Sequence, residues 1–417
     1  MKEKLKIAIV GAGVSGLIAA KVLESQGYEP TVYEASDRVG GRVKTDVVNG
    51  YQLDHGFQVL LDAYPMAKKY LDYNNLELGK FLPGATIFKT GKQVTLGDPL
   101  RSLSLLFPTL FSGIGTVADK WKIFKLNNEL KKKSIATIFN EQETTTQHYL
   151  KSKGFSNEII SDFFVPFFSG IFLEPDLSTS SRMFQFVYKM FGTGNAVLPK
   201  DGIEAIPKQL VAGLTKTNFM FNSPVESSTD GVLVFSNGKE KEIDYTIIAT
   251  EASQLVPNLR NQEIAWKTCD TIYFTTTKEI IQKPLIGLIA DAEVLVNNIF
   301  YHSSLPMKHS GAENLLSVTI VKTHQLGETE LVKMVQEELD SICGISDTTF
   351  LKRYQIKRAL PDLSNIQYDI APTETRLTAK TFLAGDQLLN GSLNAAMLSG
   401  ERAANAVLHA INDSIVS

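Results

Sequence analysis

The stretch Ile7-Ala8-Ile9-Val10, followed directly by Gly11-Ala12-Gly13-Val14-Ser15-Gly16, decides the fold of the first part of this 417-residue chain. The four apolar residues predict a buried strand, and the glycines follow it in GxGxxG spacing. Apolar residues then recur at helical period as far as Gly27, and Thr31-Val32-Tyr33-Glu34 predicts a second strand. A strand, a glycine turn, a helix and a strand within about 30 residues are the context that makes this motif specific.

Each glycine of the motif has a physical role in binding a dinucleotide. Gly11 allows the tight turn, Gly13 lets the backbone approach a pyrophosphate, and Gly16 lets the helix pack closely on the strands. The N–H groups at the start of the helix, at Val14 and Ser15, then face the phosphates, where the positive helix end also favours them.

Glu34 lies 23 residues after Gly11, where a carboxylate accepts hydrogen bonds from a ribose. Glu34 and the following Ala35 therefore belong to the predicted cofactor site. An acid at this position disfavours a 2′-phosphate, so we do not expect NADP. The alternative is an incidental glycine-rich turn, and the motif by itself does not choose between NAD and FAD.

A second glycine pair follows in Arg38-Val39-Gly40-Gly41-Arg42. Gly40 and Gly41 let the chain approach a further stretch of phosphate, and Arg42 can pair with phosphate oxygens in fork geometry. The alternative is an ordinary solvated turn with a surface arginine.

The stretch from Val10 to Glu34, with the RVGGR segment, resembles the FAD-dependent family of flavin amine oxidases, protoporphyrinogen oxidases and phytoene-type desaturases. The C-terminal part supports this, because Phe382–Asp386 and Asn394–Gly400 resemble the closing "AGD … GAxxSG" segment of the family. Inner resemblances are looser, at Leu53–Gly56 and Asn222–Val225. The resemblance implies an α/β fold, with a discontinuous Rossmann-type FAD-binding domain and an α+β substrate domain.

The resemblance also implies how the C-terminal part holds FAD, which we expect to be non-covalent because no cysteine lies near this segment. The acid of Gly385-Asp386 binds the ribityl or pyrophosphate part. A helix from about Ala395 to Ile411 begins under the pyrimidine edge of the flavin, where its positive end matches the negative charge of reduced flavin. This places backbone of Ala396 and Met397 at the ring. The further expected cofactor-binding positions are Gly56, Phe57 and Val225.

His55 is the candidate catalytic residue, because the Leu53–Phe57 segment resembles the family segment that passes near the flavin. A histidine there can hydrogen-bond a flavin edge or move a proton near neutral pH. It can equally satisfy backbone groups at a turn, and the sequence leaves both interpretations open. For His302 we favour a structural role over a place in the cavity. Two cysteines give no cysteine-rich metal site, and we expect no metal.

The two ends of the chain can meet on one FAD only if the cofactor domain is discontinuous. The expected cofactor domain comprises residues 1–75, 195–266 and 360–417, and the expected substrate domain comprises residues 76–194 and 267–359. Eight of the 23 phenylalanines fall within residues 163–191. They either pack a helical core, which we favour, or line a cavity for an apolar substrate.

The resemblance implies an FAD-dependent oxidoreductase that transfers hydride to flavin N5 and passes the electrons to oxygen or a quinone. Amine oxidases of the family carry a lysine on a strand corresponding to Asp270–Thr277, but here Lys278 comes only at its end. No aromatic pair for an amine cage is found near Ala359–Asp362. These departures favour an isoprenoid- or tetrapyrrole-like substrate over an amine. The alternatives are a flavin-dependent polyene isomerase without net redox change, an amine oxidase, and a non-enzymatic dinucleotide-binding protein.

The charge balance and the apolar runs limit the partners. Lys+Arg of 42 against Asp+Glu of 45 gives a net charge of −3, which argues against nucleic acid. We expect a cytoplasmic protein, because no apolar run is long enough for a signal peptide or a membrane span. Residues 102–133 combine apolar residues, Trp121 and lysines. This segment can lie on an anionic inner membrane face or form a lid over the substrate cavity.

Overall fold

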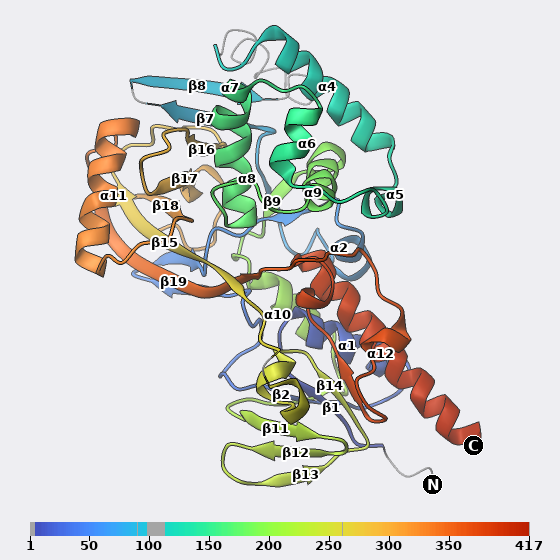
Figure 1. The fold of residues 1–417 in the computed structure, drawn as a ribbon. Coiled ribbons are helices and arrows are strands. Elements are labelled where there is room, and N and C mark those ends of the chain that lie inside the picture. The colour runs from blue at the N-terminus through green and yellow to red at the C-terminus, as the bar shows by residue number, and fades with distance from the viewer. Residues whose placement is uncertain (1–4, 90, 98–112, 261, 417) are drawn as a thin grey trace.

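The computed structural model describes residues 5–89, 91–97, 113–260 and 262–416 (Figure 1). A parallel sheet with two long helices lies at one end of the molecule, and a larger mixed sheet with a group of helices lies at the other (Figure 1). The paired strands β15 and β19 run from the larger sheet toward the parallel sheet and connect the two parts.

The parallel sheet draws its strands from three distant parts of the chain. In spatial order they are β10 (Asn218–Met220), β2 (Thr31–Tyr33), β1 (Ile7–Val10), β14 (Tyr245–Ile248) and β20 (Thr381–Leu383). All four neighbouring pairs are parallel. Every residue of β1 is buried, as an apolar run between covered faces requires. Strands β2 and β10 lie on one side of β1, and the later strands β14 and β20 lie on the other side. A ligand crevice is therefore expected at the carboxyl end of β1, where the strand order reverses.

Helices α1 (Val14–Ser25) and α12 (Leu393–Val416) pack against each other beside this sheet (Figure 1). A Cβ atom added to Gly400 would lie 2.1 Å from the carbonyl oxygen of Ser15. A Cβ on Gly16 would lie 2.1 Å from the carbonyl oxygen of Gly11. These two glycines therefore set how closely α12 approaches α1 and how closely α1 approaches the turn that precedes it.

The mixed sheet has seven strands, of which β7 and β16 form the parallel pair. In spatial order they are β19 (Thr349–Pro361), β15 (Trp266–Thr276), β18 (Asn314–Ile320), β17 (Val296–Tyr301), β16 (Ile286–Ile289), β7 (Gly84–Lys89) and β8 (Lys92–Gly97). Helix α11 (Glu328–Cys343) covers it with Leu331, Val335 and Leu339, which recur every four residues on its buried face.

Smaller elements complete the two parts. The three small sheets contain β11 (Val225–Thr229), β12 (Val232–Phe235) and β13 (Glu240–Glu242); β3 (Thr45–Val48) and β4 (Tyr51–Asp54); and β5 (Leu60–Leu61), β9 (Ala196–Leu198) and β6 (Gly79–Lys80). The other α-helices of the described residues are α2 (Pro65–Tyr70), α4 (Val117–Lys132), α5 (Ile135–Phe139), α6 (Thr146–Ser152), α7 (Asn157–Ile159), α8 (Val165–Phe172), α9 (Ser181–Thr193) and α10 (Ala205–Ala212). A π-helix, η2 (Ile160–Phe164), precedes α8, and the 3₁₀ turns are η3 (Ala252–Gln254), η4 (Pro257–Leu259), η5 (His302–Ser304), η6 (Pro372–Thr375) and η7 (Asp386–Leu388).

The structure describes only part of residues 102–133, the segment predicted to form a membrane contact or a lid. Residues 98–112 lie outside the described residues, and the remainder contains α4 and the turn before it. Among the described residues, no helix combines the length and the apolar character that a membrane crossing demands.

Candidate cofactor and substrate site

The glycine turn leaves open space at the start of α1. Gly11 has a φ of +104°, and its N–H donates to the Tyr33 carbonyl oxygen at 2.8 Å. A Cβ on Gly11 would lie 3.0 Å from the carbonyl oxygen of Ala249, whereas a Cβ on Gly13 would meet no atom within 4 Å. Gly13 is the N-cap residue of α1, and no side chain caps this end. The first N–H groups of α1, at Val14 and beyond, thus begin beside unfilled space.

The second glycine pair lies directly against this turn. Gly40 forms an isolated parallel bridge with Gly13, and a Cβ on Gly41 would lie 3.3 Å from the Cα of Gly13. Gly40 and Gly41 have φ values of +118° and +59°, and a Cβ on Gly40 would lie 2.3 Å from the carbonyl oxygen of Val43. The two glycine segments therefore form one backbone surface without side chains, as a diphosphate requires.

The carboxylate of Glu34 faces the same turn. Its Oε2 accepts the Ala12 N–H at 2.8 Å, and its Oε1 accepts the Ser36 N–H at 2.9 Å. The Glu34 carbonyl oxygen accepts the N–H of Ser223 at 2.9 Å, which brings the segment before Val225 beside this end of β2. Ala35 is exposed next to Glu34. Glu34, Ala35 and the segment before Val225 therefore lie together where a ribose would bind.

Arg42 and Asp386 form an ion pair that joins the first and last parts of the chain. We expected each of them to contact the cofactor, and the structure pairs them with each other. Arg42 also donates to the Ala359 carbonyl oxygen at 3.1 Å and lies 5.2 Å from the ring centre of Trp266. The indole N–H of Trp266 is buried and has no hydrogen-bond partner among the described residues. Gly385, at a φ of +147°, donates its N–H to the Ser399 hydroxyl at 2.9 Å.

Helix α12 begins two residues earlier than we predicted. Ser392 caps it, because its Oγ accepts the Ala395 N–H at 3.1 Å and its carbonyl accepts the Ala396 N–H at 2.9 Å. The Ala396 N–H is thus already used, and Met397 is completely buried inside the helix. Contact of Ala396 and Met397 with the flavin stays a prediction. Leu393 and the residue after it hold the first helical N–H groups, which have no carbonyl four residues earlier in the helix.

A cavity of about 890 Å³ extends from the start of α12 to helix α4. At one end it is lined by Gln58 and by the residues Gly391, Ser392 and Leu393. Its aromatic lining residues are Phe57, Tyr64, Phe81, Phe124, Phe163, Phe167, Phe168, Phe172, Tyr188 and Phe191. Five of the eight phenylalanines of residues 163–191 thus line the cavity, while the other three, Phe164, Phe184 and Phe186, are fully buried in the core. The phenylalanines of this segment therefore both pack the core and line the cavity.

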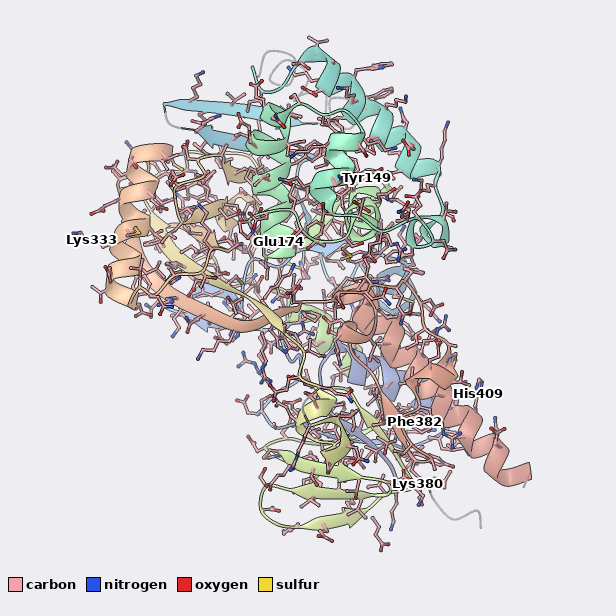
Figure 2. All side chains as sticks on the ribbon, viewed as in Figure 1. Tyr149, Glu174, Lys333, Lys380, Phe382 and His409 are labelled. Carbon is pink, nitrogen blue, oxygen red and sulfur yellow. The ribbon has the colours of Figure 1, made fainter. Side chains whose placement is uncertain are left out.

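One wall of the cavity carries a buried ion pair that the sequence analysis missed. The Nζ of Lys267 lies 3.1 Å from Glu174 Oε2, 3.1 Å from Thr179 Oγ1 and 3.8 Å from Asp362 Oδ1. Glu174, labelled in Figure 2, follows the end of α8 and is 6% exposed. Burial raises its pKa, but hydrogen bonds from Ser178 and the Thr179 N–H and the charge of Lys267 outweigh burial, so the net pKa is lowered. The two partners are 93 residues apart, and no local pattern marks them.

His55 belongs to a charged cluster beside the cavity. Its Nε2 lies 2.8 Å from Asp46 Oδ2, which also accepts the Tyr354 hydroxyl at 2.9 Å, while Arg38 donates to Oδ1 at 2.6 Å. Burial raises the pKa of Asp46, but hydrogen bonds from these three partners lower it to about 2. Phe57 lines the cavity, whereas His55 is not among the lining residues, so contact between His55 and the flavin stays a prediction.

The surroundings of Gly56 and His302 constrain both positions. Gly56 has a φ of +96°, and a Cβ there would lie 2.9 Å from Cδ1 of Ile356. His302 is 2% exposed, its Nε2 lies 3.0 Å from Ser317 Oγ, and burial lowers its pKa to about 3. It is not among the cavity-lining residues, which agrees with the structural role that we favoured.

Residues 14–408 match the family model described as flavin containing amine oxidoreductase. This chain belongs to that family. The resemblance to flavin amine oxidases and protoporphyrinogen oxidases is thereby confirmed, and FAD is the cofactor.

The chain is similar to two different kinds of oxidase. The chain is 34% identical over 158 residues to an L-amino-acid oxidase of Trimeresurus stejnegeri, covering 36% of this chain and 31% of that one. It is 29% identical over 196 residues to protoporphyrinogen oxidase 2 of Arabidopsis thaliana, covering 45% and 37%. The matches thus span about a third of the length of these relatives.

Among solved structures, cyclohexylamine oxidase from Brevibacterium oxydans IH-35A aligns with a TM-score of 0.69 at 14% identity, covering 98% of this chain and all of that one (100%). This similarity concerns the fold. The expected α/β class, with a Rossmann-type cofactor domain and a second, substrate-binding domain, is confirmed.

The residues present fit FAD. The open space at Gly13 suits a diphosphate, and the carboxylate of Glu34 suits the adenosine ribose. At the other end, the start of α12 at Leu393 meets the cavity, where a flavin ring could receive substrate. The ring of Trp266 lies beside Arg42, and its buried indole N–H has no hydrogen-bond partner among the described residues, which indicates a missing polar group.

Proposed function

We propose that this protein is an FAD-dependent oxidoreductase that removes hydride from a carbon of a large, mostly apolar substrate of isoprenoid or tetrapyrrole size. FAD, when bound, supplies the hydride acceptor at flavin N5. The observation that carries the proposal is the cavity of about 890 Å³, which has an aromatic lining and ends at the start of α12. A cavity of this size and lining can enclose such a substrate and keep it from water.

The cofactor site that we propose uses both ends of the chain. Backbone of the glycine turn, of Val14 and Ser15, and of Gly40 and Gly41 holds the diphosphate. The remaining cofactor contacts are assigned to Glu34, Ala35, Arg42, Gly56, Phe57, Val225, Gly385, Asp386, Ala396 and Met397. The domain boundaries proposed with this site are residues 1–75, 195–266 and 360–417 for FAD, and residues 76–194 and 267–359 for the substrate.

The chain's own residues would orient the substrate and support charge at the ring. The positive end of α12 at Ser392 and Leu393 favours the negative charge of reduced flavin. The aromatic wall fixes the apolar body, and the Lys267–Glu174 pair offers the polar contact to one end of the substrate. His55, held by Asp46, would move a proton at the flavin edge.

An amine is the second candidate substrate, because three acids, Glu143, Glu174 and Asp362, belong to the cavity wall. Lys267 lies within 4 Å of Glu174 and Asp362, and Arg182 lies 3.8 Å from Glu143, so each acid has a cationic partner. Among the described residues, the wall therefore lacks the isolated negative charge that a protonated amine would need, which favours the apolar substrate.

The test is anaerobic reduction of the purified holoprotein by a panel of unsaturated isoprenoids, porphyrinogens and amines. Reduction is followed as loss of the flavin band near about 450 nm. We expect bleaching by an apolar substrate, and bleaching by amines alone would refute the assignment. A polyene that isomerises only with pre-reduced flavin, without consuming reductant, would identify an isomerase. Oxygen and a quinone are then compared as electron acceptors.

A further inference from the structure

Helix α4 exposes a stripe of large apolar side chains. Val117 is 85% exposed, Trp121 is 66% exposed and Phe124 is 38% exposed. Their spacing of four and three residues places them on one face of the helix. The rings of Trp121 and Phe124 stack at 5.4 Å, so the stripe has a continuous aromatic part. The opposite face is in the core, where Leu126 and Leu130 are buried.

Lysines continue the same face toward the C-terminal end of α4. Lys125, Lys131 and Lys132 are exposed and follow Val117 by eight, fourteen and fifteen residues, which returns them to the side of the stripe. The exposed surface of this helix is therefore apolar at its beginning and basic at its end.

The two acids of α4 do not cancel this charge. Asp119 is completely buried and accepts hydrogen bonds from Thr116 and Ser156, which close the N-terminal cap. Glu129 is paired with Lys153 at 2.9 Å and with Lys133 at 3.5 Å. Both carboxylates are thus bound by neighbours, and the face that carries Trp121 is left with a positive potential.

The exposed helix is also a wall of the substrate cavity. Ile123 and Phe124 line the cavity, so Phe124 belongs both to the exposed stripe and to the cavity wall. Helix α4 lies at the outer edge of the molecule, at the end away from the parallel sheet (Figure 1). A surface in contact with α4 would thus lie against the far end of the cavity.

We infer that α4 lies on an anionic lipid bilayer. Val117, Trp121 and Phe124 enter the boundary between headgroups and acyl chains, where tryptophan is favoured. Lys125, Lys131 and Lys132 contact the lipid phosphates, and each contributes attraction to an anionic surface. This contact concerns the protein surface and does not depend on which substrate is oxidised.

The test is flotation of the FAD-loaded protein with vesicles of phosphatidylcholine alone or mixed with phosphatidylglycerol. We expect flotation with the anionic vesicles that weakens as salt is raised. Val117→Ser/Trp121→Ser, which changes no cavity-lining residue, should lower the partition coefficient at least about tenfold. Each of Lys131→Gln and Lys132→Gln should lower it about fivefold. Since these side chains are exposed, the melting temperature should not change.

Control variants distinguish insertion of α4 into the bilayer from nonspecific adsorption to vesicles. Val47→Ser/Phe350→Ser removes exposed apolar groups on β3 and β19 and should float like the wild type. The chain has two tryptophans, so the emission of Trp121 should shift to the blue on binding, and Trp121→Phe should lose the shift but still float. Absence of flotation, or equal flotation of Val117→Ser/Trp121→Ser, overturns the inference. So does a dimer that this double variant dissociates, which would make the stripe a self-association face.

Discussion

Replacing Gly13 by alanine tests where the diphosphate lies. Gly13 has extended backbone, with φ −71° and ψ 174°, which alanine also adopts, and its added Cβ would meet no protein atom within 4 Å. Without cofactor the variant should thus fold normally, because exchanging glycine for alanine at an N-cap costs at most about 1 kcal/mol. With cofactor, the methyl group would occupy the space proposed for phosphate oxygens.

The expected loss of affinity follows from the hydrogen bonds that the methyl group displaces. A hydrogen bond to a charged group contributes about 1.5–3 kcal/mol. Since about 1.4 kcal/mol is a factor of ten, losing one such bond from the backbone at Gly13 should weaken FAD binding about 10- to 100-fold. Gly16→Ala is the matched comparison, because its Cβ would lie 2.1 Å from the Gly11 carbonyl oxygen. We expect it to destabilise the fold by about 1–3 kcal/mol even without FAD.

The assay is titration of apoprotein with FAD, together with unfolding of each apoprotein in urea. Unchanged FAD affinity in Gly13→Ala would show that the phosphates do not approach this turn. A strongly destabilised Gly13→Ala apoprotein would show that the space beside Gly13 is not open. Either result would refute the reasoning, whereas Gly16→Ala reports only on packing.

Substitutions at three further places, Asp54, the Lys267–Glu174 pair and His55, test the ionisable groups. Asp54 is buried, and burial raises its pKa from 3.8 to about 6. Its contribution to stability is therefore present below pH 4 and lost as the pH rises through 6, so Asp54→Asn should add up to about 3 kcal/mol in urea unfolding at pH 8 and little at pH 4. Lys267→Met leaves Glu174 unpaired and should cost about 3–5 kcal/mol, while Lys267→Met/Glu174→Met should regain most of it. In flavin reduction assays the double variant should lose preference among substrates that differ in their polar end. His55→Gln should change the pH profile of flavin reduction; an unchanged profile would leave His55 a structural role beside Asp46.

The sequence predicted those parts of the site whose chemistry is local. The glycines around Gly13 and the carboxylate of Glu34 are fixed by a turn and two strands within one short segment, so spacing alone places them. The start of α12 was misplaced because the resemblance drew attention to Ala396 and Met397. The N-cap signal was present in Ser392, which follows Asn390-Gly391 and precedes the apolar helix.

The missed contacts depend on pairing between distant segments. Asp46 meets Tyr354 only because β3 and β4 lie against β19, and Lys267 meets Glu174 only because the first residues of β15 cross the end of α8. Such contacts follow from strand register and from the angle between the two parts of the molecule. A single sequence contains no spacing rule for either.

The phenylalanines of residues 163–191 explain why core and cavity could not be separated from the sequence. The π-helix η2 ends at Phe164 and inserts an extra residue per turn, which changes the faces expected from a regular helix. Phe163 and Phe167 then stack at 5.6 Å in the cavity wall, while Phe164 turns into the core. Because the cavity runs from Leu393 to α4, a substrate reacting at the start of α12 would extend along this wall toward the far end. The proposed function therefore predicts an elongated apolar substrate rather than a compact one.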